Sequence, residues 1–334
     1  MFRSAISAFF KTLCVIVGIG AGALIVSVGM SFMPMSIEPH MQTTTIAYRN
    51  ALGETTLTGP VIARINIHGV IGMGDLRTEK VQALLDATQE GMYKGRTKAL
   101  FLHINSPGGA AVDSENIYHA LMAYKEKYKV PIYAYADGLC ASGGMMISCA
   151  ADTVLASPPS LIGSVGVVLS PFFNFTGLME KVGVASETVT AGKNKRPFNP
   201  FRPWKANEGE DLKKITEGMY LSFITLVSKE RPKLTVDKLR HEYGANIFMT
   251  EGAIERGYIH GSAKTLTAAL NHFIEIGNLP KESAIIGPAI RHSLLEAFGS
   301  KPGSMSIQHE IKGVDTLPAE MQNRLCYLYL PGAQ

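Results

Sequence analysis

The chain has 334 residues, of which 46% are hydrophobic and 18% are charged. This length allows one large domain or two small ones with a substantial core, and the composition suits a globular protein that carries some membrane sequence. The formal net charge of +4 is small for this length and no dense stripe of lysine and arginine occurs, so the sequence gives no case for nucleic-acid binding.

The N-terminal segment contains an uncharged run from Leu13 to Phe32, which is long enough to cross a lipid bilayer. Arg3 and Lys11 precede this run, and Glu38 is the first acidic residue after it. The positive-inside rule then leaves the N-terminus in the cytoplasm and the rest of the chain on the exported side. We therefore expect a single-pass anchor in the inner (plasma) membrane.

A cleaved secretory signal is the competing interpretation of the same segment. Ala21-Gly22-Ala23 would serve as a small-residue cleavage site, but the apolar run continues through 24–26, which favours an uncleaved anchor. An exported compartment permits disulfides. Cys140, Cys149 and Cys326 show no metal-ligand spacing, however, and we expect buried free thiols.

Strand-like and helical segments alternate from residue 61 onward, which predicts an α/β domain on a largely parallel sheet. We expect strands at 61–67, 99–104, 131–136, 153–155 and 165–169, and helices at 78–90, 113–127, 142–151, 207–229, 236–241, 250–256 and 266–276. We divide the chain into an N-terminus with its anchor (1–33), a polar tether (34–59), the α/β domain (60–285) and a tail without a clear pattern (286–334).

Two glycine-rich segments each follow a predicted strand: 105–109 (NSPGG) and 138–144 (GLCASGG). In open α/β sheets, ligands bind at the carboxyl ends of the strands. Ser142 would lie at such a turn, where the peptide dipoles of the following helix favour developing negative charge, so it is a candidate nucleophile.

Three glycines in these segments are candidate donors to an oxyanion. Gly143 follows the serine directly, and its backbone N–H is available at the start of the predicted helix. Gly108 and Gly109 can supply a second donor from the neighbouring strand end. Glycine pairs are also common in ordinary turns that follow strands, so these segments alone are weak evidence for catalysis.

Other kinds of site have little support. The phosphate-binding pattern GxxxxGK[ST] is absent, and no GxSxG elbow surrounds Ser142, which argues against the common hydrolase triad. His241 and Glu242 do not continue into HExxH, which argues against a zinc protease. His68 and His103 lie at strand ends and are the only histidines that suggest a base for Ser142, and we interpret His103 as packed beside the loop.

Three segments occur in an order that resembles the SppA-type signal peptide peptidase (protease IV) family: 104–109, 137–144 and 162–167. The resemblance runs from about Val61 to Gly261. It implies a Clp-protease or crotonase-like parallel-sheet fold and a catalytic Ser–Lys dyad, with no metal or organic cofactor.

This resemblance assigns the nucleophile to Ser142 and places the lysine in a Gly-x-x-Lys segment that precedes a stretch similar to Ser-Pro-Phe-Arg-Pro. Here that segment is 192–195, followed by 199–203. The alignment favours Lys195 as the base, with Lys193 as the alternative. A free lysine titrates near pH 10.4, so burial or a nearby cation such as Arg196 would have to favour its neutral form.

The resemblance also implies a homo-oligomeric ring on the membrane, in which Lys195 acts on Ser142 of an adjacent chain, and substrates that are membrane-embedded signal-peptide remnants. Our hypothesis is a membrane-anchored serine endopeptidase that degrades released signal peptides and other membrane-associated peptides. A crotonase-like acyl-CoA enzyme and a non-catalytic membrane scaffold of the same fold remain the alternatives.

Overall fold

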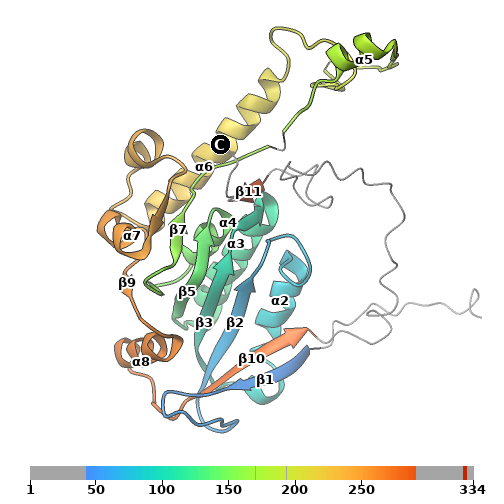
Figure 1. Ribbon diagram of the computed structural model, residues 1–334. Coiled ribbons are helices and arrows are strands. Elements are labelled where there is room, and N and C mark those ends of the chain that lie inside the picture. Colours follow the sequence, from blue (N-terminus) through green and yellow to red (C-terminus); the bar gives the residue numbers. More distant parts are fainter. Residues whose placement is uncertain (1–42, 170, 193, 291–325, 329–334) are drawn as a thin grey trace, which may run out of the picture. The chain divides into compact units, whose positions relative to one another are not determined.

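The computed structural model describes residues 43–169, 171–192, 194–290 and 326–328 (Figure 1). The expected anchor, from Leu13 to Phe32, lies outside these residues, and so does Lys193. Within the described ranges, no helix is both long and apolar enough to cross a membrane.

The described strands form one large mixed sheet and one small antiparallel pair (Figure 1). The large sheet has nine strands in the order β1-β10-β2-β3-β5-β6-β9, with β7 on β5 and β8 on β7. These strands are β1 (Thr43–Tyr48), β2 (Val61–His68), β3 (Thr97–Ser106), β5 (Ile132–Ala141), β6 (Thr153–Ala156), β7 (Leu161–Gly163), β8 (Ile247–Met249), β9 (Gly261–Ser262) and β10 (Ala284–Ile290). The small pair joins β4 (Gly108–Ala110) to β11 (Cys326–Leu328). The central pairs β2–β3, β3–β5 and β5–β6 are parallel, so the prediction of a largely parallel sheet is confirmed.

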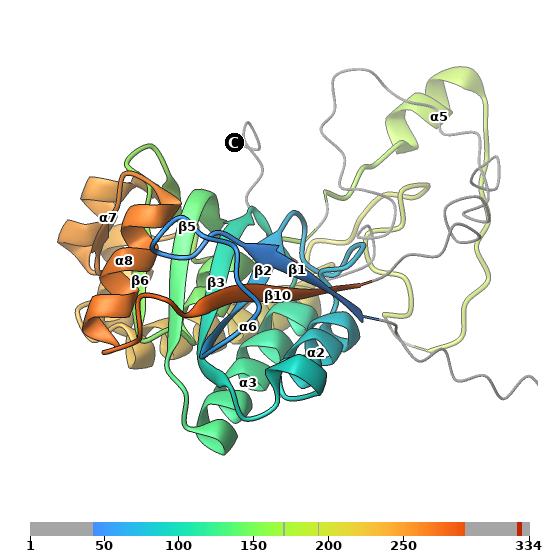
Figure 2. The same ribbon diagram turned by 90° about the horizontal axis from the view of Figure 1, so that it is seen from below.

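Helices cover both faces of this sheet (Figure 2). They are α2 (Thr78–Ala87), a 3-10 turn (Gly91–Tyr93), α3 (Ala111–Tyr128), α4 (Gly143–Ser148), α5 (Thr176–Val182), α6 (Glu210–Glu230), a π-helical turn (Lys238–Tyr243), α7 (Thr250–Arg256) and α8 (Leu266–Ile276). Successive side chains of a strand point to opposite faces of the sheet, so the core has two parts, one on each face. Ile65 and Leu102 pack with α2, α3 and α4 on one face, whereas Phe101 and Tyr135 pack with Phe273 of α8 on the other.

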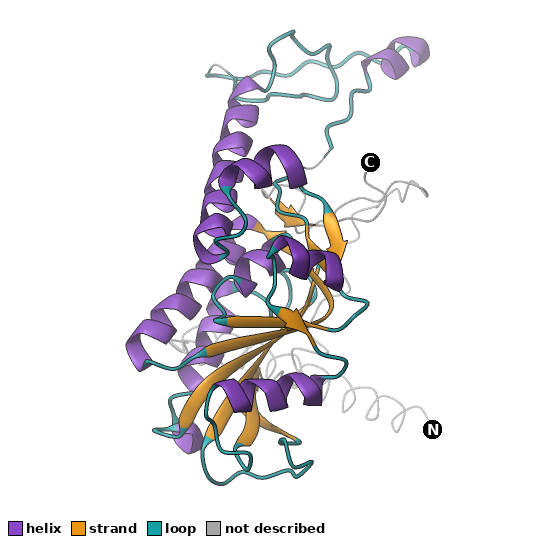
Figure 3. Ribbon diagram, turned by 90° about the vertical axis from the view of Figure 1, so that its left-hand side faces the viewer, coloured by secondary structure: helices purple, strands orange, loops and turns teal. Residues whose placement is uncertain are grey.

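Helix α6 is anchored at one end only. Its buried residues are Phe223, Ile224 and Val227, all in its carboxyl-terminal half. Its amino-terminal half extends beyond the sheet and joins a segment that we call the arm, residues 171–192 and 194–209 (Figure 3). Helix α5 of the arm buries none of its residues. The arm is therefore held mainly by contacts of its own.

The edge of the sheet differs from the sequence prediction. Strand β1 lies inside the segment expected to be a tether, where it pairs antiparallel with β10, and β10 continues past residue 285. The exposed β1 carries no clean alternation of apolar and polar residues, so its pairing depends on β10 rather than on local pattern. The prediction of a strand at 165–169 is also wrong, because the strand in this region is β7, at Leu161–Gly163.

Candidate functional site

Ser142 occupies a sharp turn between β5 and α4, as the sequence predicts. Its backbone has a φ of +55° and a ψ of −117°, a conformation that a non-glycine residue adopts only under strain. Two hydrogen bonds hold this turn: the Ser142 N–H donates to the Gly163 carbonyl (2.8 Å), and the Ser142 carbonyl accepts from the N–H of Met146 (3.0 Å). A strained strand-to-helix turn of this kind also presents the nucleophile of α/β-hydrolases, although the GxSxG sequence is missing here.

The hydroxyl of Ser142 is buried, and it lacks a hydrogen-bond partner among the described residues. A buried hydroxyl without a partner costs about 1–3 kcal/mol, so each such group calls for an explanation. Five other buried side-chain atoms among the described residues also lack a partner, but Ser142 is the one in this group whose backbone has a positive φ. The neighbouring Gly143 is required by close packing, because a Cβ there would lie 2.2 Å from Ser114 Oγ. The turn therefore holds a serine hydroxyl with unused hydrogen-bonding capacity.

The two glycine-rich segments meet, as expected. Ser106 pairs with Cys140 across β3 and β5, and a Cβ on Gly144 would lie 3.0 Å from the Ser106 carbonyl oxygen. Gly109 is fixed by the Ile71 backbone, because a Cβ there would lie 2.1 Å from its carbonyl oxygen.

The three candidate oxyanion donors are not equivalent. The Gly108 N–H already donates to Ser106 Oγ (3.1 Å), so it is engaged inside the loop. Gly109 and Gly143 have no such bond from their N–H groups to a side chain in the part of the chain that the structure describes. Gly109 lies opposite Tyr327 in the ladder with β11, so Gly143 is the better candidate to donate to an oxyanion and Gly109 the second.

The edge of β4 carries an extended segment of the same chain (Figure 1). Strand β11 pairs antiparallel with β4, with Leu328 opposite Gly108 and Tyr327 opposite Gly109. β11 also contacts α4, the helix that follows Ser142. The backbone beside the candidate nucleophile can therefore bind an extended peptide by strand addition.

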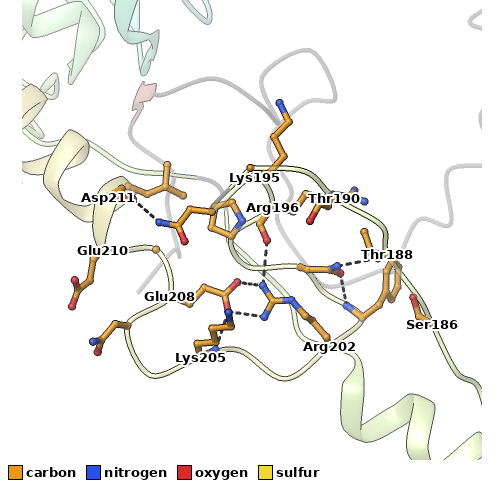
Figure 4. A pocket seen from close by; sticks show the side chains of 18 residues that line it. Ser186, Thr188, Thr190, Lys195, Arg196, Arg202, Lys205, Glu208, Glu210 and Asp211 are labelled. Carbon is orange, nitrogen blue, oxygen red and sulfur yellow. Dashed lines mark hydrogen bonds and ion pairs between the residues drawn. The ribbon is translucent and has the colours of Figure 1, made fainter.

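Lys195 is exposed and lies on the arm. It lines a cavity of about 910 Å³ whose walls come entirely from residues 186–212, so Ser142 is not part of it (Figure 4). Its side chain extends away from the ion pair of Arg202 and Glu208. The structure thus does not bring the two members of the expected dyad together within one chain.

Sequence reasoning missed Glu208, a residue that organises this part of the arm. Its carboxylate pairs with Arg202, with Arg202 Nη2 at 2.5 Å from Glu208 Oε1. The hydrogen bond from Arg202 lowers the pKa of Glu208 to about 2. In the sequence, Glu208 is distinguished only as one of three acidic residues near the start of α6, with Glu210 and Asp211. Acidic residues are equally typical of any helix N-terminus.

The strand-end histidines do not reach Ser142. His103 lies on the opposite face of the sheet from α4, where it stacks with Phe101 and Tyr135. Its Nδ1 accepts a hydrogen bond from Arg64 Nη2 (2.7 Å) and lies 3.0 Å from His68 Nε2. Burial, reinforced by Arg64, lowers the pKa of His103 to about 4. Neither its position nor its pKa suits a base for Ser142.

The two described cysteines near the site are buried free thiols, which confirms the expectation for Cys140 and Cys149. Burial raises the pKa of Cys140 to about 12 and that of Cys149 to about 11. Because the thiolate is the reactive form, neither is a competing nucleophile.

Comparisons with known proteins agree with these features. Residues 124–274 match the model of peptidase family S49, and residues 78–162 match that of Clp protease. A Synechocystis protein named as a protease is 32% identical over 61% of this chain and 70% of its own length. The chloroplastic serine protease SPPA of Arabidopsis thaliana is 31% identical over 53% of this chain and 26% of its own.

A Brucella melitensis protein named as the Na(+)/H(+) antiporter NhaA is 34% identical over 50% of this chain. That match covers only 23% of the Brucella protein, so the chain spans about a quarter of both this relative and the Arabidopsis one. The Synechocystis match, in contrast, covers most of that protein's length. Together with the two family models, it shows that the chain belongs to peptidase family S49, the family of SppA-type serine proteases.

Proposed function

We propose that the chain is an endopeptidase in which Ser142 is the nucleophile and Lys195 is the general base. One observation carries this proposal most directly. The unpartnered hydroxyl of Ser142 lies at a strained turn beside β4, whose edge binds an extended peptide segment. A peptide held there would bring its carbonyl groups next to a hydroxyl that has no other partner among the described residues.

The proposed reaction follows from these groups. Ser142 Oγ attacks the peptide carbonyl carbon while its proton passes to the neutral amine of Lys195. The N–H groups of Gly143 and Gly109 donate to the oxyanion that forms. The C–N bond then breaks, and the lysine returns the proton to the leaving amine. A water molecule, deprotonated by the same lysine, hydrolyses the acyl-enzyme and restores the serine.

The position of Lys195 favours a site shared between two copies of the chain. Within one chain the arm holds Lys195 in a cavity that excludes Ser142, and its amine is exposed. An adjacent copy would supply both the missing partner and the burial that favours a neutral lysine. This is the arrangement that the family resemblance implies for a ring.

We further propose a membrane location and apolar substrates. The uncharged run from Leu13 to Phe32 would anchor the chain, with the catalytic domain on the exported side. A cavity of about 310 Å³ follows β7, and Val167, Val168 and Tyr220 are among its lining residues. Ser164, Thr216 and Glu217 also line this cavity, so its apolar part, rather than the whole lining, suits an apolar side chain of a signal-peptide remnant.

The test is labelling with a serine-reactive probe together with peptide hydrolysis. Ser142→Ala should abolish both, whereas Lys195→Ala should abolish hydrolysis without unfolding the domain. Lys193→Ala is the matched control and should keep most activity. Activity lost in Lys193→Ala but kept in Lys195→Ala would reassign the base. A wild-type chain that neither labels nor hydrolyses would instead support the non-catalytic scaffold.

Mixing the two inactive variants tests the shared site. If Lys195 of one copy serves Ser142 of another, assemblies of Ser142→Ala with Lys195→Ala contain some intact pairs and should regain part of the activity. Co-purification of differently tagged variants shows that mixed assemblies form. Mixed assemblies without activity would place the dyad within one chain.

A further inference from the structure

The carboxylate of Glu208 is the centre of a hydrogen-bond cluster in the arm (Figure 4). Arg202 donates to both of its oxygens, from Nη1 to Oε2 (2.8 Å) and from Nη2 to Oε1 (2.5 Å). The backbone N–H of Phe198 donates to Oε1 (2.7 Å), and that of Lys205 donates to Oε2 (2.9 Å). The side chain of Glu208 is only 6% exposed. A two-pronged pair with further backbone donors fixes geometry more firmly than an ordinary surface ion pair.

This cluster reaches the residues on either side of Lys195. Arg202 Nη2 also donates to the carbonyl oxygen of Arg196, the next residue in the chain (3.4 Å). On the other side, Asn194 Nδ2 donates to Asp211 Oδ2 in the first turn of α6 (3.0 Å). The backbone at Lys195 is therefore held from both neighbours, while its own side chain stays free to extend from the arm.

The backbone of this segment needs such support. Asn194 and Phe198 have φ angles of +58° and +55°, a backbone region that asparagine tolerates but that is unfavourable for phenylalanine. Gly209, with a φ of +80°, packs so tightly that a Cβ would lie 2.0 Å from Phe198 Cζ. Each strained residue costs about 1–3 kcal/mol and persists only where surrounding contacts hold it. Glu208 supplies the contact at Phe198, by accepting from its N–H, and Asp211 supplies the one at Asn194.

We infer that Glu208, acting through Arg202, is a positioning residue for Lys195. The inference rests on the proposed dyad, because it concerns the placement of the proposed base. Glu208 does not touch the reacting atoms, and it holds the backbone from which the lysine amine reaches the serine hydroxyl. A displacement of about 1 Å between reacting groups can lower the rate by about 10²-fold. Loss of the Glu208 cluster should therefore lower kcat and leave KM nearly unchanged.

The central experiment compares Glu208→Gln with Glu210→Gln, which removes an exposed carboxylate from the first turn of α6. We expect Glu208→Gln to lower kcat by about ten- to a hundredfold with KM nearly unchanged, and Glu210→Gln to match wild type. The serine-reactive probe should label Glu208→Gln more slowly but to the same final stoichiometry. Slow but complete labelling means that every site is folded and that the base is displaced.

Arg202 provides a second, independent variant. Arg202→Lys keeps the positive charge but loses the two-pronged geometry, and it should lower kcat in the same direction by a smaller factor. Combined with Glu208→Gln it should cause little further loss, because the two side chains act as one unit. This series remains informative even if Glu208→Gln is recovered only in low yield.

Lys195→Ala, assayed in parallel, separates the two hypotheses. An active Lys195→Ala would remove the proposed dyad itself. With Lys195→Ala inactive, a Glu208→Gln enzyme as active as Glu210→Gln would overturn the positioning role and leave the dyad standing. Labelling stoichiometry that falls in proportion to kcat would also overturn it, because Glu208 would then only keep the arm folded.

Discussion

The backbone N–H of Ser142 donates a 2.8 Å hydrogen bond to the carbonyl oxygen of Gly163, the last residue of β7. The next residue, Ser164, in turn donates from its N–H to the Asn246 carbonyl (2.8 Å). The strained turn at Ser142 is thus held from the neighbouring strand, whose own end is fixed by the segment before β8.

Gly163→Ala should disturb this arrangement. Gly163 has a φ of +121°, and a Cβ there would lie 2.7 Å from the Asn246 carbonyl oxygen. We expect a loss of about 1–3 kcal/mol in the free energy of unfolding and a lower kcat, measured by urea unfolding and peptide hydrolysis. Gly177→Ala is the control, because a Cβ at Gly177 has open space and should be tolerated. Similar behaviour of the two variants would show that β7 does not hold the turn.

The buried side chain of Arg231 should be important for stability. Its Nη2 donates to the Ser148 carbonyl at the end of α4 (2.9 Å), and its Nε donates to the Tyr258 carbonyl (3.2 Å). Arg231→Leu would remove the hydrogen bond to the Tyr258 carbonyl and leave the Ser148 carbonyl with only its bond from the Ala151 N–H, and it should lower the free energy of unfolding by roughly 2–4 kcal/mol. Arg240→Leu removes an exposed pair with Glu217 and should cost about 0–1 kcal/mol. Equal melting temperatures for the two variants would contradict this assignment.

The pH dependence of stability should contain a contribution from His103. Its pKa is lowered to about 4 in the folded chain, whereas an unfolded histidine titrates near 6.5. Between these values the unfolded chain binds more protons, so the free energy of unfolding should fall as the pH drops from about 6.5 to about 4. In His103→Gln this slope should be shallower in urea titrations across that window. An unchanged slope would assign the effect to other groups, of which His68 is the first candidate because its pKa is also lowered.

Glu208 titrates in a different window. Its folded pKa of about 2 lies below that of an unfolded glutamate, near 4.3, so its stabilising contribution is present above about pH 4.3 and is lost as the pH falls toward 2. The contributions of His103 and Glu208 to the free energy of unfolding can therefore be measured separately.

Removal of residues 326–334 should free the edge of β4. In the intact chain, β11 occupies this edge and competes with a peptide at high effective concentration, because it is part of the same molecule. We expect the truncated chain to have a lower KM with kcat unchanged. A synthetic peptide with the removed sequence should then inhibit it competitively. A KM unaffected by the truncation would mean that substrates do not use the edge of β4.

Much of the site follows from the sequence alone. The sequence predicts both the place of Ser142 at a strand-to-helix turn and the meeting of its segment with Gly108 and Gly109. Both predictions depend on patterns within a few residues: an apolar strand, a glycine-rich turn, and the rule that parallel strands end at one edge of the sheet. The same local patterns predict α6 to within a few residues of its observed bounds.

Tertiary structure alone decided the rest. The strained φ of Ser142 and the orientation of His103 away from it depend on neighbouring strands, and β1 becomes a strand only because β10 lies beside it. The separation of Lys195 from Ser142 is set by α6, which is anchored at one end and carries the arm at the other. Glu208 joins backbone and side-chain groups up to ten residues away in an irregular segment, where no periodicity marks the contacts. A sequence shows what each residue can bond to, but in irregular segments the folded backbone determines which partners come within reach.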